Sequence, residues 1–139
     1  METTIHRASV SWDGGQGEDA RAHEVLLGAQ SLPSSSALEF GGDDSKSNPE
    51  MLLVGALSSC HMLWFLALAG KKGFEVASYE DDAEAVLDGK RFTSATLRPR
   101  VRWAEDPPPP EAIEALHERA HGLCFIANSV DFPVGVEPQ

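Results

Sequence analysis

Cys60 and Cys124 are the residues of this chain with the greatest capacity for chemistry, and they are its only cysteines. Two cysteines are too few to hold together a disulfide-rich scaffold. In such a chain they are two small core residues, a redox pair or part of a metal site. Free cysteine is among the residue types most often buried, so composition alone favours inert core residues. The sequences around the two cysteines must therefore decide.

A metal site is one alternative that these residue types leave open. His117, His121 and Cys124 are spaced i, i+4 and i+7, which places them on one face if a helix continues through them. Cys60 would supply a fourth ligand. However, Gly122 is expected to break that helix, and His117 is expected to lie at the surface. Near-stoichiometric zinc in the purified protein would favour this alternative.

Cys60 lies in the most apolar segment of the chain, because no Asp, Glu, Lys or Arg occurs from Met51 to Gly70. Before this segment, Ser47-Asn48 offers a helix N-cap and Pro49 fits the first helical position. After it, the run Lys71-Lys72-Gly73 predicts a cationic last turn and a stop. The whole segment is therefore predicted to form one long central helix.

A charge-free run of this length also approaches the roughly 20 residues of a membrane span. The Ser58–His61 stretch would then place four polar or reactive side chains at its midpoint, where hydrocarbon penalises them. We therefore expect a helix buried on nearly all sides within a water-soluble fold. A chain of 139 residues can barely surround such a helix alone, so a second subunit is expected to help cover it.

Shorter elements are predicted on both sides of the central helix. The predicted strands cover residues 3–12, 24–30, 74–87, 92–103 and 132–136. The apolar spacing of Ile113, Leu116 and Ala120 predicts a second helix over Glu111–His121. Strands and helices in this order predict an α+β fold, in a single domain of residues 1–139.

The pair Asp88-Gly89 predicts a tight turn that joins the third and fourth strands into a hairpin. Arginines alternate with apolar residues along the fourth strand, and Pro99 indicates an edge or a bulge there. This arginine stripe suggests anion binding, but we expect it to pair with acidic residues across the hairpin. The acidic residues in question are Glu80, Asp82 and Glu84, and the arginines are Arg98, Arg100 and Arg102.

The net charge of the chain is -11 at pH 7, with a pI near 4.7. A surface this acidic repels nucleic-acid phosphates and anionic lipid, so neither nucleic acid nor a membrane is expected as a partner. The opening segment, Met1 to Trp12, has no apolar stretch of the kind found in secretory signals. We therefore expect a cytoplasmic protein, and a reducing cytosol would not keep a structural disulfide oxidised.

The sequences around both cysteines resemble those of a known family. Asn48-Pro49-Glu50, followed by Ser58-Ser59-Cys60-His61-Met62, is similar to the central-helix signature of the OsmC/Ohr family of hydroperoxide reductases. The segment from Ala120 to Asn128 resembles the second-cysteine segment of that family. Ser78-Tyr79-Glu80-Asp81 and Leu97-Arg98-Pro99-Arg100-Val101 resemble its OsmC-like branch.

This resemblance implies an OsmC-like fold, in which antiparallel sheets wrap around a long buried central helix in an intertwined homodimer. It implies a stress-response peroxidase that reduces organic hydroperoxides to alcohols without a bound cofactor or metal. Cys60 would attack the peroxide and become a sulfenic acid, and Cys124 would condense with it to a disulfide. An external dithiol, of the dihydrolipoyl type, would restore both thiols.

The resemblance also implies an arginine from the N-terminal region, paired with Glu50. Arg21 is the favoured candidate and Arg7 the alternative. Its guanidinium would stabilise the Cys60 thiolate, whereas His61 points about 100° around the helix and is a poor base for Cys60. Glu50 and Cys60 are ten residues apart, about 15 Å along a straight helix. We therefore expect Glu50 of one chain to approach Cys60 of the other.

An alternative of a different class is a non-catalytic protein with the same fold, which holds a small ligand in an apolar pocket. A thiol pair can persist in such a protein without turnover. Peroxide consumption by the wild type and by Cys60→Ser separates the two alternatives, because only an enzyme loses activity with Cys60.

Overall fold

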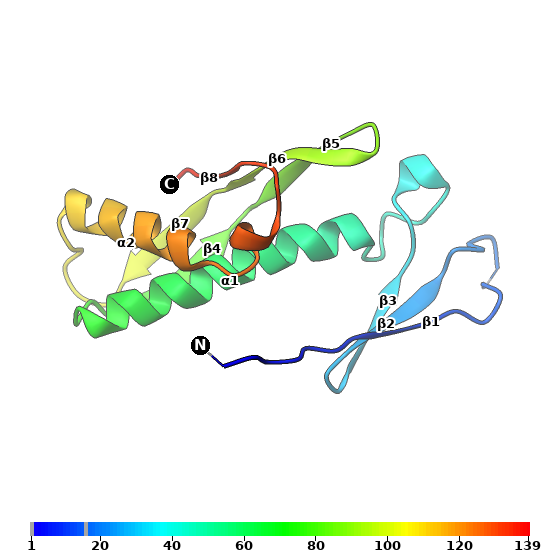
Figure 1. The fold of residues 1–139 in the computed structure, drawn as a ribbon, viewed down its shortest axis with the longest axis horizontal. Coiled ribbons are helices and arrows are strands. Elements are labelled where there is room, and N and C mark those ends of the chain that lie inside the picture. The colour runs from blue at the N-terminus through cyan, green and yellow to red at the C-terminus, as the bar shows by residue number, and fades with distance from the viewer. Residues whose placement is uncertain (1, 16) are drawn as a thin grey trace. The chain divides into compact units, whose positions relative to one another are not determined.

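The computed structural model describes residues 2–15 and 17–139, which form two compact units (Figure 1). The first unit comprises Met1–Leu52 and the second Leu53–Gln139. The long helix α1 (Pro49–Lys71) begins at the end of the first unit and runs on into the second.

The first unit contains one antiparallel sheet of three strands, β1 (Ser9–Ser11), β2 (His23–Leu27) and β3 (Gln30–Ser34). β2 and β3 form a hairpin whose turn contains Gly28, at a positive φ of 61° that glycine adopts without steric cost. Within residues 3–12, which were predicted as one strand, the structure has a strand only at Ser9–Ser11. The strand predicted for residues 24–30 was wrong beyond Leu27, because Gly28 reverses the chain there.

The ends of α1 confirm the predicted signals. The side-chain Oδ1 of Asn48 accepts a hydrogen bond from the backbone N–H of Met51, at 2.8 Å, and so caps the first turn. Pro49 is the first helical residue, and the helix ends at Lys71, two residues before Gly73, whose φ is 77°.

Within this chain only one stripe of α1 is buried. Its buried residues are Leu57, His61, Phe65 and Ala69, each one turn after the last. On other faces Leu63 is 60% exposed. Within the single chain the sheets and second helix cover one side of α1, so burial on nearly all sides, which was expected with the help of a second subunit, stays a prediction.

Among the described residues, α1 is the one helix that is long and apolar enough to cross a membrane by length and composition. Core helices of water-soluble proteins share this property. The buried stripe packs against the rest of the second unit. The Ser58 hydroxyl of α1 also donates a hydrogen bond to Asp81 on β4 (Val76–Asp81).

A long two-part hairpin follows α1 in the second unit. Its strands after β4 are β5 (Glu84–Asp88), β6 (Arg91–Leu97) and β7 (Pro99–Trp103). β5 pairs with β6 around Gly89, and β4 pairs with β7, both antiparallel, as the Asp88-Gly89 signal predicts. The break between β6 and β7 falls at Arg98, just before Pro99, where the Arg98 N–H donates to Asp81 at 2.6 Å. The short β8 (Val134–Val136) adds to β6 in parallel.

The arginine stripe pairs across this hairpin as predicted. Arg98 lies 2.9 Å from Glu84, and Arg100 lies 3.0 Å from both Glu80 and Asp82. These pairs are largely solvent-exposed, so each contributes little to stability. The stripe is accordingly a solvated face of the sheet.

The second helix, α2 (Pro110–Leu123), is longer than predicted. It begins at the last residue of the proline run and continues through Gly122 to Leu123, with Cys124 as its C-cap, and the short 3-10 helix η2 (Ala127–Ser129) follows. The expectation that Gly122 breaks the helix was wrong. Glycine lowers helix stability by about 1 kcal/mol, and packing of the neighbouring turns offsets this cost.

Two clusters of apolar side chains hold the second unit together. Toward the start of α1, Leu57 packs with Ala95, Leu97 and Phe132 from β6 and the C-terminal segment. Toward its end, α2 lies beside α1, as Figure 1 also shows, and buried residues of both helices form the other cluster. That cluster consists of Phe65, Ala69, Leu116 and Ala120. Two helices with these sheets make the fold α+β, as the sequence predicts.

Candidate active site

The fold brings the two cysteines together. Cys60 projects from the middle of α1, and Cys124 is the residue that ends α2. The two thiols lie close enough to perturb each other, and both are free rather than joined in a disulfide. The fold thus brings the two predicted cysteines together, and their roles stay predictions.

The environments of the two thiols differ. Cys124 is 1% exposed, whereas Cys60 is only half-buried. Burial raises the pKa of the Cys124 thiol, and the nearby Cys60 thiol raises it further. The backbone N–H of Ala127, 3.4 Å from the Cys124 sulfur, acts in the opposite direction. Cys124 is thus held as a neutral thiol away from solvent, while Cys60 is the thiol that a solute can reach.

Aromatic side chains connect the two cysteine segments. Trp64, one turn after Cys60, meets Phe125, the residue after Cys124, edge to face, with ring centroids 5.5 Å apart. Phe125 is about half exposed, so the contact also presents apolar surface to solvent beside the thiols. An apolar solute would find favourable contacts here.

The predicted activating pair is not formed within one chain. Arg21 is exposed, its guanidinium lies near Gly41, and it makes no ion pair among residues 2–15 and 17–139. Glu50 lies in the first turn of α1, with its Oε2 atom buried and without a hydrogen-bond partner. Arg7, the alternative candidate, is also exposed. The roles of Arg21 and Glu50 therefore stay predictions.

A buried histidine pair also joins α1 and α2, and sequence reasoning missed it. Nε2 of His61 lies 3.0 Å from Nδ1 of His117, and the two rings are nearly parallel, at 3°. Phe65 stacks on the His117 ring, with centroids 4.3 Å apart. Burial lowers the pKa of each histidine from 6.5 to about 4, so both rings are neutral near pH 7.

The expectation that His117 lies at the surface was wrong, since it is only 4% exposed. Its position was readable from helical spacing, because it follows Ile113 by four residues and precedes Ala120 by three. The segment His117-Glu118-Arg119-Ala120-His121 also has the spacing that puts two histidines on one side of a helix.

The metal alternative gains no support from this geometry. In the part of the chain that the structure describes, no group of three or more His, Cys, Asp or Glu residues could hold a metal ion. Nδ1 of His117 is already engaged by His61, and Cys124 by Cys60 and Ala127.

Together, fold and site define a class of protein: an α+β protein with a thiol pair between its central helix and the end of a second helix. The model of the OsmC family, described as OsmC-like protein, matches residues 42–139. The chain belongs to the OsmC-like family, as its cysteine motifs predict.

Solved structures agree with this assignment. An OsmC-like protein of unknown function from Vibrio cholerae is 32% identical, with a TM-score of 0.90 over 99% of this chain and 100% of that one. The organic hydroperoxide resistance protein OsmC from Legionella pneumophila has a TM-score of 0.68 at 20% identity, over 97% and 99% of the two chains. The organic hydroperoxide resistance protein OhrB of Bacillus subtilis has 0.67 at 19%, over 98% and 100%. No curated protein matches the sequence.

Proposed function

We propose that this protein is a thiol-dependent peroxidase that reduces organic hydroperoxides to alcohols. The observation that carries the proposal is the proximity of Cys60 and Cys124 across α1 and α2, as free thiols of unequal burial. Two of the structural relatives, at 20% and 19% identity, are named organic hydroperoxide resistance proteins, which agrees with this reaction.

The positions of the two thiols support the following reaction. The Cys60 thiolate attacks one peroxide oxygen, the O–O bond breaks, and the other oxygen leaves as an alcohol after taking up a proton. Cys60 is then a sulfenic acid. The Cys124 thiol attacks the Cys60 sulfur, water leaves, and a disulfide forms. An external dithiol exchanges with that disulfide, becomes oxidised itself and returns both cysteines to thiols.

The exposures of the two thiols distinguish their roles. Cys60 is half-buried and accessible, as an attacking residue must be. Cys124 is almost fully buried, and its pKa is raised, so it does not compete for the peroxide. Its proximity to Cys60 nevertheless places it where the sulfenic acid forms.

The surroundings of the thiols support a substrate with an apolar group. Trp64 and Phe125 provide apolar, partly exposed surface next to the cysteine segments. Burying the alkyl or aryl group of a hydroperoxide there contributes about 25 cal/mol per Å² of apolar surface, which hydrogen peroxide cannot gain. We accordingly assign organic hydroperoxides as the preferred substrates.

The proposal includes a homodimer in which Arg21 and Glu50 of one chain complete the site of the other. Glu50 has a buried oxygen without a partner in its own chain, which supports a donor from elsewhere. A guanidinium held by Glu50 would stabilise the Cys60 thiolate and the peroxide oxygens. The cytoplasm, with a dihydrolipoyl-type dithiol, is the proposed setting.

Peroxide consumption with cumene hydroperoxide and dihydrolipoamide tests the reaction. The wild type is expected to turn over many times, and Cys60→Ser only at the uncatalysed rate. Cys124→Ser is expected to turn over more slowly than the wild type, because its sulfenic acid must react directly with the external dithiol. Ser59→Ala, a change at an exposed neighbour of Cys60, is the control and should keep wild-type activity. Equal, slow consumption by the wild type and Cys60→Ser would refute the proposal.

A further inference from the structure

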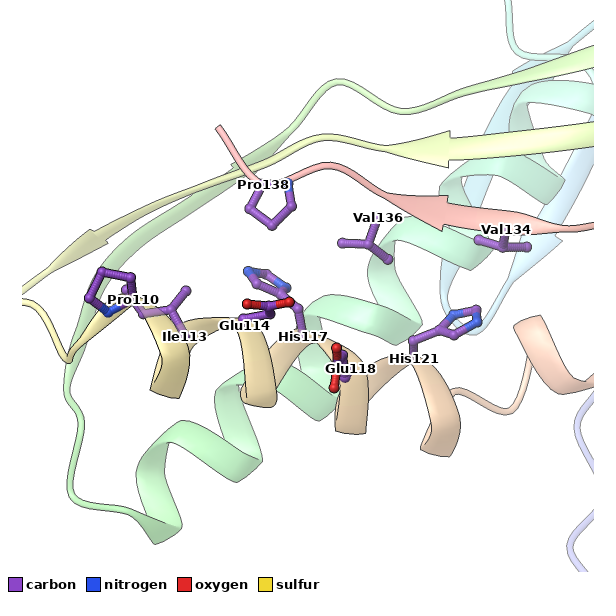
Figure 2. A pocket seen from close by; sticks show the side chains of 9 residues that line it. All are labelled: Pro110, Ile113, Glu114, His117, Glu118, His121, Val134, Val136 and Pro138. Carbon is purple, nitrogen blue, oxygen red and sulfur yellow. The ribbon is translucent and has the colours of Figure 1, made fainter.

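A cavity of about 590 Å³ lies in the second unit between α2 and the C-terminal strand β8 (Figure 2). Neither cysteine lines it, so it is separate from the thiol pair. Its volume falls within the range of about 300–1,000 Å³ that small-molecule sites occupy. The size and position of the cavity suit a ligand that plays no part in the thiol chemistry.

One wall of the cavity is apolar. It is formed by Val134 and Val136 of β8 and by Pro138, and Pro110 and Ile113 at the start of α2 add apolar surface across from them (Figure 2). Such a wall accommodates a hydrocarbon group and offers it no hydrogen-bonding partner from a side chain.

The other wall is polar and carries negative charge. Glu114, Glu118, His117 and His121 come from successive turns of α2, and no lysine or arginine lines the cavity. The two glutamates are exposed at its edge, and the whole chain has a net charge of -11. The field in the cavity therefore attracts a cation and repels a carboxylate or phosphate.

His117 adds a specific hydrogen-bonding group. It lines the cavity although it is 96% buried, with an exposed fraction of 4%. Its Nδ1 is bound to His61 of α1, so Nε2 lies on the opposite edge of the ring, away from α1. Nε2 has no hydrogen-bond partner among the described residues. Figure 2 shows the His117 and His121 side chains projecting from α2 toward the side where Val136 and Pro138 lie.

We propose that this cavity is a binding site for a small organic ammonium ion. Its apolar group packs against Val134, Val136 and Ile113, and its charge lies near Glu114 and Glu118. One ammonium N–H donates to Nε2 of His117.

This arrangement requires one tautomer of the histidine pair. An ammonium ion can only donate, so His117 must accept at Nε2 and carry its proton on Nδ1. That proton is then donated to Nε2 of His61, which in turn carries its own proton on Nδ1. Ligand binding therefore fixes the proton positions on both rings, one of which lies next to Cys60.

Calorimetric titration of the full chain with three probes of one shape tests the charge preference. The probes are benzylammonium, benzyl alcohol and benzoate, at neutral pH and low salt. Benzylammonium is expected to bind at least about tenfold more tightly than benzoate, and its affinity should fall as salt is added. Equal affinities for the three probes, or no saturable binding of benzylammonium, would overturn the proposal.

Variants locate the site. Glu114→Gln/Glu118→Gln is expected to weaken benzylammonium binding about two- to tenfold, the range for two partly screened ion pairs. Glu75→Gln/Glu105→Gln removes the same charge from exposed positions that do not line the cavity and should bind as the wild type does. An identical loss in both double variants would mean that net charge alone attracts the probe, and the site would be rejected.

Heteronuclear NMR of the imidazole nitrogens reports which ring nitrogen carries the proton. A purely structural role of His117 would leave this property unchanged on ligand addition. Benzylammonium should shift His117 and His61 toward the Nδ1-protonated tautomers, and benzyl alcohol should do so less completely, because a hydroxyl can also accept. Unchanged imidazole signals at saturating benzylammonium would contradict the assigned contact. The Cys60→Ser protein should bind benzylammonium with the wild-type affinity. Failure of the proposed peroxidase function and failure of the proposed binding site can therefore be distinguished.

Discussion

At the scale of single residues, the central feature is two pairs of side chains between α1 and α2. Cys60 interacts with Cys124, and His61, the residue after Cys60, shares a hydrogen bond with His117 of α2. Because the histidines are buried and neutral, they cannot supply the positive charge that a Cys60 thiolate needs. The activating cation must therefore come from outside this cluster.

The histidine pair predicts how stability depends on pH. Burial lowers the folded-state pKa of His61 and His117 to about 4, while the unfolded chain has about 6.5, so the unfolded chain binds more protons in between. Protonation of this pair therefore leaves the free energy of unfolding unchanged above about pH 6.5, and lowers it as the pH falls from 6.5 toward 4. Urea unfolding at a fixed protein concentration should show this loss.

The double variant His61→Leu/His117→Leu is the comparison for that measurement. Replacing both hydrogen-bond partners by apolar groups leaves no unpaired atom, so the variant is expected to fold. Its stability should fall less steeply than that of the wild type between pH 6.5 and 4. Parallel curves for the two proteins would show that other groups cause the acid sensitivity.

At the scale of elements, Asp81 couples the central helix to the hairpin. Its carboxylate accepts hydrogen bonds from the Ser58 hydroxyl of α1, at 2.5 Å, and from the Arg98 N–H between β6 and β7, at 2.6 Å. Ser58 precedes Cys60 by two residues. The contact therefore fixes the position of α1 near the attacking thiol against the sheet.

Asp81→Ala is expected to reduce the free energy of unfolding by about 1.5–3 kcal/mol, because two partly buried donors lose a charged acceptor. Asp82→Ala is the matched control, since Asp82 is exposed and bonds only with Arg100. Its cost should be about 0–1 kcal/mol. Urea midpoints of both variants check the difference, and equal losses would assign Asp81 no special role.

At the scale of the whole molecule, apolar surface is left uncovered on both units. Leu63 of α1 is 60% exposed, and in the first unit Val10 and Trp12 are 69% and 62% exposed. Monomeric proteins rarely leave extended apolar patches in water. The exposed surface, together with the unpartnered Glu50 Oε2, supports the proposed homodimer.

Mixing two inactive variants tests whether the partner chain completes the site. Cys60→Ser and Glu50→Ala chains are each expected to be inactive as homodimers. In a mixed dimer with shared sites, the intact Cys60 of one chain meets the intact Glu50 of the other. Random mixing should then recover about a quarter of wild-type activity, because half of the dimers are mixed and each has one working site. If both residues act within one chain, no activity returns.

Local signals were enough to predict several elements of this protein. The Asn48 cap, Pro49 and Gly73 set the bounds of α1, and Asp88-Gly89 set the turn of the hairpin. The cross-strand pairing of Arg98 and Arg100 followed from side-chain alternation. These features depend on residues close in sequence or on a regular register, so a single sequence carries the information.

What the sequence by itself determined is thus the two cysteines with their motifs, and the helices and hairpin that carry them. Only the tertiary structure decided that the thiols lie close together, that Cys124 is the buried one, and that His117 leaves the surface to pair with His61. The physical reason is that burial and protonation depend on neighbours far apart in the chain. Sequence patterns encode which face of an element is apolar, but not which polar groups the packed faces bring within hydrogen-bonding distance.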